Sequence, residues 1–398
     1  MSLVINTNVS SLNAQNNLSK SQSALATATQ RLSSGLKINS AADNAAGFAI
    51  SQRYTTQIGG LNQASANASD AINLAQTAGS ALDQVTANLQ AIRDLAVQAA
   101  NGTYTDSDRS SIDQEVQQRL AEITRIANQT TFNGSKVLDG SLGTKSFQVG
   151  ADVGQTISVS LGTSVKSADI GKIAQVETTN LSGAFVDASG NATTVDLSKI
   201  AITGTDGKAV TLAGTASSAQ DLADKINAAG ITGVSAAVDG KGGISLFAAG
   251  SFSINDSGSI ASGSVLGSGA ITDSAYKNGA STASDIGSGT IDTAGSLEGS
   301  DVLTVNNANA LISRVDVALK TVSDFAAQLG AVQNRFQSTI STVAAQTTNL
   351  QSSQSTIQDA DFAAETAALS KAQVLQQAGI SVLAQANSNP QQVLKLLQ

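Results

Sequence analysis

The stretch LISRVDVALKTVSDFAAQLGAVQNRFQSTISTVAAQTTNL, residues 311–350, decides the fold of this chain. Its seam positions recur at steps of three and four: Leu311, Val315, Ala318, Val322, Phe325, Leu329, Val332, Phe336, Ile340, Val343, Thr347 and Leu350. A spacing that averages 3.5 residues keeps one apolar stripe facing a partner helix in a left-handed supercoil. The pattern therefore predicts a long coiled-coil helix that needs a partner.

A partner stripe lies nearer the other end of the chain. It consists of Ile58, Leu61, Ala68, Ile72, Ala75, Gly79, Leu82, Leu89, Ile92 and Ala96. A shorter helix is predicted over residues 107–128, with Asp106 or Ser107 as its N-cap. The three helices are expected to form one rod. Its predicted seam is Ile58, Leu61, Ile72, Leu82, Leu89, Leu311, Val315, Val322, Phe325, Leu329, Val332 and Phe336.

Beyond the shorter helix the signals change to turn and strand. Asn133-Gly134 is a hairpin turn signal, and TISVSL (156–161) alternates as a half-buried strand does, so a β-hairpin is expected on the rod. The middle is different again, because 20 of the 35 glycines fall within residues 178–300. Residues 199–254 have the pattern of a small α+β unit. The predicted fold is mostly α: a rod over residues 45–177 and 301–350, with a β-rich (α+β) outer domain inserted at 178–300.

The two extreme ends, residues 1–44 and 351–398, carry weaker heptad-like rows in which many positions are Ala, Ser, Thr, Gln or Gly. Each arm buries too little apolar area to offset a chain entropy of about 1–2 kcal/mol per residue, so disorder is expected in the monomer. Arms of many copies can complete this burial together, and a head-to-tail contact that does not close gives an open helical filament. The predicted assembly residues are Leu18, Leu25, Leu32, Leu36, Leu369, Leu375, Leu383, Leu394 and Leu397.

The composition excludes much chemistry. The 398 residues include no Cys, His or Trp, which removes disulfides, thiolate nucleophiles, Ser-His-Asp triads and the commonest zinc and haem sites. No phosphate-binding glycine loop or G-x-S-x-G elbow occurs, and Asp359 or Asp361 is explained as a helix N-cap. We therefore expect no enzyme, no catalytic or metal-binding residue and no cofactor.

The charge and hydropathy patterns argue against two classes of partner. The net charge is −8 and no Lys/Arg cluster is visible, which disfavours binding to nucleic acid. No apolar run reaches the roughly 20 residues that span a bilayer, and the start lacks the pattern of a secretory signal. We expect neither a membrane protein nor export by the general secretory route.

Several segments carry a family resemblance: INTNVSSLNAQNNL (5–18), QRLSSGLKINSAADNAAGFAIS (30–51), LQAIRDLAVQAANG (89–102), QRLAEITRIANQTTFNGSKVLDG (118–140) and AQVLQQAGISVLAQANSNPQQVLKLL (372–397). They resemble bacterial flagellin. The resemblance implies a secreted, extracellular subunit whose arms form concentric coiled-coil tubes in a filament used as a swimming propeller. It also implies type III export, with the flagellar export apparatus, an export chaperone, hook-associated junction proteins and the filament cap as partners. The alternatives are a hook-filament junction protein and a carbohydrate-binding flagellin homologue.

The resemblance further implies recognition by host flagellin receptors. The epitope read by plants maps to residues 30–51, where Asp43 and Gly47 match the family pattern while Ala42 and Asn44 replace a usual Lys and a usual Asp. The surface read by an animal Toll-like receptor maps to Gln90, Arg93, Leu95, Ile112, Glu115 and Arg119. Ala91 departs from a commonly basic position, so weakened signalling is expected there.

Overall fold

The computed structural model describes residues 8–178, 180–186, 191–239, 241–256, 276–278, 289–291 and 293–396. The helices are α1 (Val9–Ser34), α2 (Ala45–Ala99), α3 (Asp106–Gln129), α4 (Ala219–Ala228), α5 (Val305–Gln358) and α6 (Phe362–Leu396), with short 3-10 helices η1 (Ser182–Phe185) and η2 (Leu197–Lys199). The strands are β1 (Thr131–Phe132), β2 (Ser135–Lys136), β3 (Gly143–Gln148), β4 (Thr156–Leu161), β5 (Ala174–Glu177), β6 (Val195–Asp196), β7 (Ile200–Thr203), β8 (Ala209–Thr211), β9 (Thr215–Ala216), β10 (Val234–Val238), β11 (Ile244–Ala248), β12 (Phe252–Asp256), β13 (Tyr276–Asn278) and β14 (Gly289–Ile291).

The chain divides into two compact units. Unit 1 consists of Met1–Ser69, Gln148–Thr156 and Gln337–Gln398, and unit 2 of Asp70–Phe147 and Ile157–Phe336. The divisions fall inside the long helices α2 and α5 and inside the hairpin β3–β4. The units therefore do not follow the domain limits expected from the sequence.

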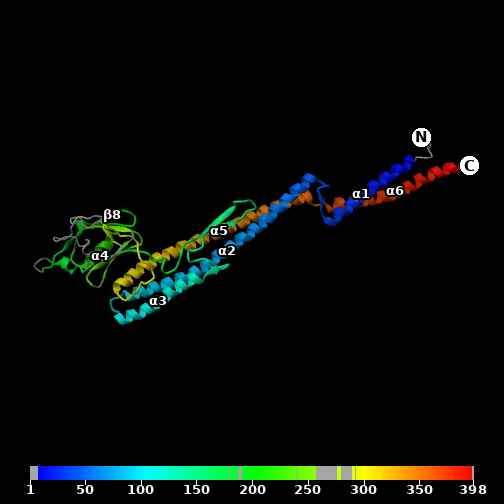
Figure 1. Cartoon of the computed structure of the whole chain (residues 1–398). Helices are drawn as coiled ribbons and strands as arrows, with labels where there is room; N and C mark the ends of the chain where they lie inside the picture. The colour runs from blue at the N-terminus through cyan, green and yellow to red at the C-terminus, as the bar shows by residue number, and fades with distance from the viewer. Residues whose placement is uncertain are drawn as a thin grey trace. The chain divides into compact units, whose positions relative to one another are not determined.

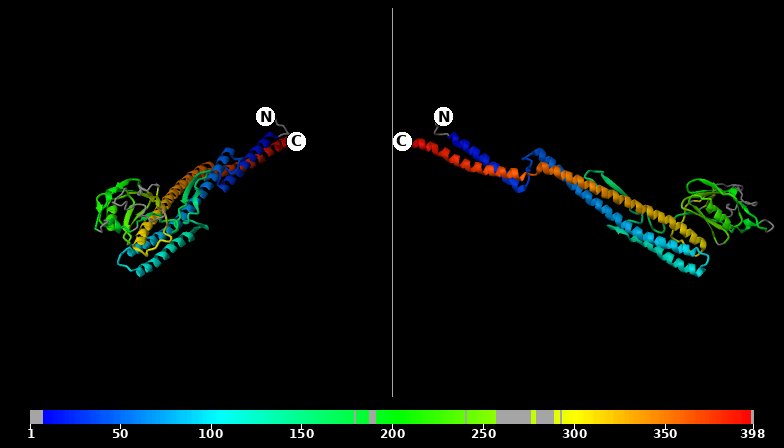
Figure 2. Two further views of the ribbon diagram at one scale, coloured as in Figure 1. Left: turned by 60° about the vertical axis from the view of Figure 1, so that its left-hand side comes forward. Right: turned by 180° about the vertical axis from the view of Figure 1, so that it is seen from behind.

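In unit 1 the two ends of the chain pack together. Helices α1 and α6 lie side by side in every view, with the N- and C-termini at the same end (Figures 1 and 2). Where α1 meets the region between α5 and α6, the backbone N–H of Lys37 donates to the carbonyl of Gln358 at 2.7 Å. Gly35 ends α1 at a φ of 71°, in the left-handed region that favours glycine. The return of both termini to one place agrees with the predicted fold class.

In unit 2 the rod is formed by α3 and by the parts of α2 and α5 that belong to this unit, residues 70–99 and 305–336 (Figure 1). On α5, nine predicted seam positions are buried: Leu311, Val315, Ala318, Val322, Phe325, Leu329, Phe336, Val343 and Thr347. The predicted position Val332 is half-buried.

The seam of α2 follows a stricter pattern than the expected one. Besides Leu74, the buried positions from Leu61 onward are Leu61, Ala64, Ala68, Ala71, Ala75, Ala78, Leu82, Val85, Leu89, Ile92, Ala96 and Ala99. Every step in this series is three or four residues, in strict alternation. The expected positions Ile72 and Gly79 are each one residue late, and both they and Ile58 are half-buried. The chain places alanine at the seam where the larger Ile72 would hold the helices apart.

Helix α3 extends one residue beyond its predicted range at each end. Its N-cap is Thr105, so the expectation of Asp106 or Ser107 is wrong. The backbone N–H of Asp108 donates to Thr105 Oγ1 at 3.2 Å, and the backbone N–H of Thr105 donates to Asp108 Oδ2 at 3.0 Å. This reciprocal pair is a capping box, in which Asp takes the place of the more usual Glu.

Both hairpin signals correspond to paired strands. Strands β1 and β2 pair across Asn133 and Gly134, whose φ values of 47° and 76° match the tight turn that an Asn-Gly pair favours. Strands β3 and β4 form the second hairpin, and the alternation in β4 buries Ile157, Val159 and Leu161.

The inserted region has its own core between two sheets. One sheet has the order β10-β11-β5 and the other the order β13-β14-β12-β7-β8. Helix α4 contributes Leu222, Ala223 and Ile226 to a continuous apolar cluster that includes Ile200, Ile202 and Leu246. The expected α+β unit over residues 199–254 is confirmed in its strand-helix-strand order. Strand β5 ends at Glu177, before the expected boundary at 178, and is hydrogen-bonded to β11 within the insert.

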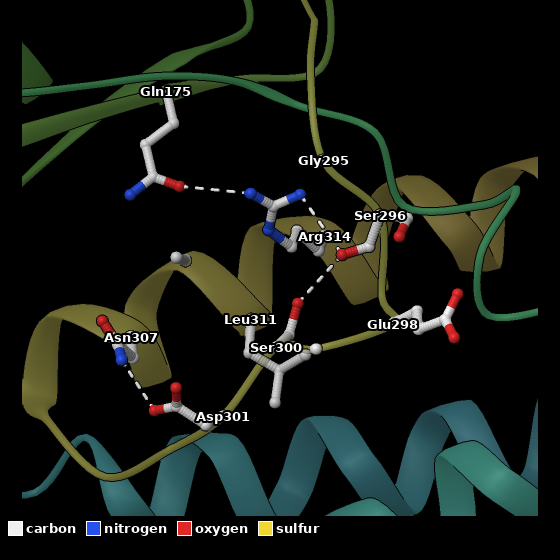
Figure 3. Close-up of a pocket in the computed structure, with 11 residues that line it drawn as sticks. Gln175, Gly295, Ser296, Glu298, Ser300, Asp301, Asn307, Leu311 and Arg314 are labelled. Carbon is white, nitrogen blue, oxygen red and sulfur yellow. Dashed lines mark hydrogen bonds between the residues drawn. The ribbon is translucent and has the colours of Figure 1, made fainter. Parts of the chain in front are cut away.

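A polar network joins the insert to α5. Arg314 Nη2 on α5 donates to Gln175 Oε1 at 3.4 Å, and Arg314 Nη1 donates to the carbonyl of Ser296 at 3.3 Å (Figure 3). Gln175 Nε2 and Asn306 Nδ2 both donate to Glu177 Oε1, at 2.8 and 2.7 Å. Side-chain hydrogen bonds therefore hold strand β5 against the first turns of α5.

Candidate functional site: the assembly surface

The predicted assembly leucines lie mainly in the seam between α1 and α6. Leu18, Leu25, Leu32, Leu369 and Leu383 are half-buried, interleaved with the buried alanines Ala14, Ala28, Ala372 and Ala386. A Cβ added at Gly379 would lie 3.3 Å from Leu18 Cδ1, so small residues let the two helices approach closely. Leu36 is also half-buried, Leu397 lies outside the described residues, and nothing is described of the Leu394 side chain.

A different set of apolar side chains faces outward from the arms. Eleven large apolar residues are exposed in the described part of the chain, and seven of them are on α1 and α6: Val9, Leu12, Phe362, Val374, Leu375, Ile380 and Val382. Leu375 is the one predicted assembly residue among them. Sequence reasoning missed the other six because it searched for seams, and each helix has one seam that its partner arm already occupies.

The arms bury little elsewhere. Ala14 and Ala28 are the buried residues of α1, and on the described part of α6 only Ala372 and Ala386 are buried. Exposed large apolar side chains that are concentrated on one part of a chain indicate a site of protein or membrane contact. The described arms carry only five cations, spread along the sequence at Lys20, Arg31, Lys37, Lys371 and Lys395, so a protein surface fits better than an anionic membrane.

The residues expected at the animal receptor surface come from α2 and α3 of unit 2. Arg93 Nε donates to Asp316 Oδ1 at 2.6 Å, and this bond raises the pKa of the Arg93 guanidinium. Arg119 and Glu115 form an ion pair at 2.7 Å on α3. Leu95 and Ile112 are half-buried, whereas Gln90 is exposed. Sequence reasoning did not anticipate Asp316, because no pattern along the chain links positions 223 residues apart.

Asp43 and Gly47 have local structural roles. Asp43 Oδ2 accepts hydrogen bonds from the backbone N–H of Ser40 at 2.8 Å and of Asn39 at 3.1 Å, and these bonds lower the pKa of the carboxyl. Gly47 is buried, and a Cβ there would lie 2.6 Å from Ile38 Cδ1. Asn44, which replaces a usual Asp, accepts from the backbone N–H of Gly47 at 3.0 Å and so begins α2.

Comparison with known proteins places the chain in a family. Residues 5–142 match the model "Bacterial flagellin N-terminal helical region", residues 312–397 "Bacterial flagellin C-terminal helical region", and residues 199–250 "Flagellin hook IN motif". The chain is 40% identical to Flagellin B of Vibrio cholerae over 400 residues and 38% identical to B-type flagellin of Pseudomonas aeruginosa over 489 residues. Both alignments cover all of both chains. The chain belongs to the bacterial flagellin family.

Flagellin from Salmonella typhimurium is 37% identical over 500 residues, again with all of both chains covered. A solved structure of FliC from Burkholderia pseudomallei is 29% identical, covers 67% of this chain and 99% of that one, and has a TM-score of 0.38. As a flagellin, the chain is a structural protein and not an enzyme, and it is a subunit of the flagellar filament. Among the described residues no helix is long and apolar enough to cross a membrane.

Proposed function

We propose that this flagellin polymerises through the outward faces of α1 and α6, and that the arms order fully only when they enter the filament. The observation that carries the proposal is the concentration of exposed apolar side chains on the arms, with seven of the eleven on α1 and α6. Coupling of folding to burial is how weakly apolar segments gain order on binding.

The proposal divides the chain by role. The arms, residues 1–44 and 351–398, form the filament core; residues 45–177 and 301–350 form the rod around it; and residues 178–300 face outward. The predicted leucines Leu18, Leu25, Leu32 and Leu369 hold α1 to α6, while Leu375 and its exposed neighbours contact other copies. Half-buried packing of the first group and exposure of the second support this division.

We propose for this chain the partners that the family resemblance implies. They are the flagellar export apparatus, an export chaperone, the hook-associated junction proteins and the filament cap, with an extracellular filament as the assembled product. Host flagellin receptors are proposed to contact Gln90, Arg93, Leu95, Ile112, Glu115 and Arg119. The ion pair of Arg93 with Asp316 means that a receptor must compete for, or accept, a guanidinium that is already paired.

Truncation tests the assembly proposal. Deletion of residues 5–36 or 369–397 removes one arm and leaves α2, α3 and α5 whole. Purified protein is seeded with filament fragments and followed by electron microscopy, with the full chain as control. We expect filaments from the full chain alone, while circular dichroism of the truncated chains still reports a helical rod. Normal filaments from either truncated chain would overturn the proposal.

Ordering of the arms needs its own measurement. Amide hydrogen exchange is compared between the dilute monomer and the filament. Residues 9–34 and 362–396 are expected to exchange fast in the monomer and slowly in the filament, whereas the α2 residues 71–99 exchange slowly in both. Protected arms in the monomer would contradict coupled folding but would leave the filament role intact.

A further inference from the structure

One apolar side chain outside the arms stands apart from the rest. Val153, at the tip of the hairpin β3–β4, has a relative exposure of 104%, the highest of the large apolar residues that the structure describes. It belongs to unit 1, in the segment Gln148–Thr156. Exposed valines are common on flexible tips, where they need no explanation. This tip is different because its backbone is held firmly.

Hydrogen bonds close the loop below Val153. The backbone N–H of Val149 donates to the carbonyl of Gln155 at 2.8 Å, and the backbone N–H of Asp152 donates to Gln155 Oε1 at 3.3 Å. Gln148 Nε2 donates to the carbonyls of Gly150 and Asp152. A rigid loop that presents an apolar side chain is prepared for binding, since little conformational entropy remains to be lost.

The tip is also fastened to α2. Asn67 Nδ2 donates to the carbonyl of Gln148 at 3.0 Å. A Cβ added at Gly60 would lie 3.1 Å from the Cβ of Ala151, so the missing side chain lets the loop lie against the helix. Val153 and its acidic neighbour Asp152 thus project from a fixed point of unit 1.

A complementary groove lies on the same helix, closer to its N-terminus. On the surface of α2, two adjacent rows of residues at i, i+4 and i+8 line a shallow, open groove of about 560 Å³: Phe48, Gln52 and Thr56 form one row and Ala49, Arg53 and Gln57 the other. Rows at this spacing form ridges, and side chains of a neighbouring element pack into the groove between two ridges. Phe48 is half-buried and supplies apolar surface beside the small side chain of Ala49.

The charges at the tip and in the groove are opposite. Asp152 adjoins Val153 at the tip, and Arg53 lies in the groove. Arg53 is exposed and has no ion-pair partner within the described ranges. Because the chain carries a net charge of −8, copies repel one another unless local contacts of opposite sign offset the repulsion. An acidic tip entering a basic groove supplies such a contact.

We propose that the hairpin tip of one subunit docks into the α2 groove of a second copy of this chain, with Val153 against Phe48 and Ala49 and with Asp152 beside Arg53. The inference rests on the filament function proposed above. Tip and groove are formed by different residues of one unit, so the contact can repeat head to tail from copy to copy. A head-to-tail contact whose rotation does not close builds an open helical assembly, as the filament requires.

Cysteine cross-linking tests the contact, because the chain contains no Cys of its own. Two single variants, Val153→Cys and Ala49→Cys, are mixed, co-polymerised and oxidised, and the linked peptides are identified by mass spectrometry. In such a mixture a 153–49 disulfide forms only between different copies. We expect it in filaments and not in the dilute mixture of monomers.

The matched control replaces the groove cysteine with Val97→Cys, an exposed position on α2 outside the groove. We expect no 153–97 product. Filaments that contain no 153–49 product, or as much 153–97 product, would overturn the contact while leaving the filament function standing. Failure of the unaltered chain to polymerise would instead count against the filament function.

Charge reversal supplies an independent test. Asp152→Lys and Arg53→Glu are each expected to raise the critical concentration for polymerisation about threefold or more, and the double variant to restore it to within about twofold, as complementary charges do across an interface. Circular dichroism checks that each variant is folded. A double variant no better than the worse single variant would contradict the pairing of these two residues.

Discussion

The rod helices and the arm helices use the same kinds of residue to different effect. In the rod, the stripe of α2 from Ala71 to Ala99 is buried at every third or fourth residue, and α5 sets Val322, Phe325 and Leu329 in its own buried stripe. In the arms, the buried residues of the corresponding seam are alanines, its leucines are only half-buried, and other large apolar residues face outward. Three helices enclose a seam that two helices leave open. The comparison shows that the number of covering elements, more than the sequence of any one helix, decides where a stripe becomes a core.

The largest effect is expected from a cavity in the rod. Phe325→Ala empties the site of a large, fully buried side chain on α5 and is expected to destabilise the monomer by about 3–5 kcal/mol. Urea denaturation followed by circular dichroism measures the change. Val97→Ala, at an exposed position of α2, is the control and should change the stability by less than about 0.5 kcal/mol. Equal effects of the two changes would mean that the rod seam is not a packed core.

A smaller effect is expected from overfilling the same seam. Ala78 on α2 is fully buried, so Ala78→Leu should cost about 1–3 kcal/mol. The adjacent change Gly79→Ala should have the opposite sign and stabilise the helix by up to about 1 kcal/mol, because a Cβ at Gly79 meets no atom within 4 Å. The two substitutions together test whether position 78 or position 79 lies in the seam. Destabilisation by Gly79→Ala would place the seam one residue later.

Much of the architecture could be predicted from periodicity. On α5, where large residues occupy nearly every seam site, nine of the twelve predicted positions are buried, whereas Val332, Ile340 and Leu350 are half-buried. On α2, hydrophobicity favours Ile72 over Ala71, although only Ala71 continues the alternation from Leu61. The assembly surface was predicted less well, because exposed apolar residues become visible only when it is known which face of each arm the other arm covers.

Thr105→Ala is expected to lower the free energy of unfolding by about 1 kcal/mol, because it removes the N-cap oxygen of α3 that accepts from the backbone N–H of Asp108. Thermal denaturation of the monomer measures the loss. Thr105→Ser keeps the hydroxyl and is the control, which should remain close to the unaltered chain. A Ser variant as unstable as the Ala variant would show that the methyl group, and not the cap, carries the effect.

Acid should weaken the same cap. The side-chain hydrogen bond from Thr105 and the backbone N–H of Thr105 lower the pKa of Asp108 below its ordinary value of 3.8. A carboxyl with a lowered pKa stabilises the fold above 3.8 and loses that contribution as the pH falls through the folded value. The protection of the amides at residues 105–109, relative to their intrinsic exchange rates at each pH, is expected to fall in that window, and Asp108→Asn should remove this pH dependence. An unchanged acid response in Asp108→Asn would assign it to other carboxyls.

The smallest effect on the stability of the monomer is expected at Leu375, although the same change is expected to weaken polymerisation strongly. Leu375 on α6 is 48% exposed, so Leu375→Ala removes little buried area and should leave the stability of the monomer within about 0.5 kcal/mol. In the filament the same side chain is proposed to be covered by a neighbouring copy, and its loss should raise the critical concentration for polymerisation about tenfold, as about 1.4 kcal/mol does. Leu369→Ala, half-buried in the seam between the arms, is the comparison: it should weaken the contact of α1 with α6 as well as assembly. If Leu375→Ala polymerised normally, the outward face of α6 would not be the assembly surface. The rod and the arms would then differ only in how well their seams are buried and hence in their stability.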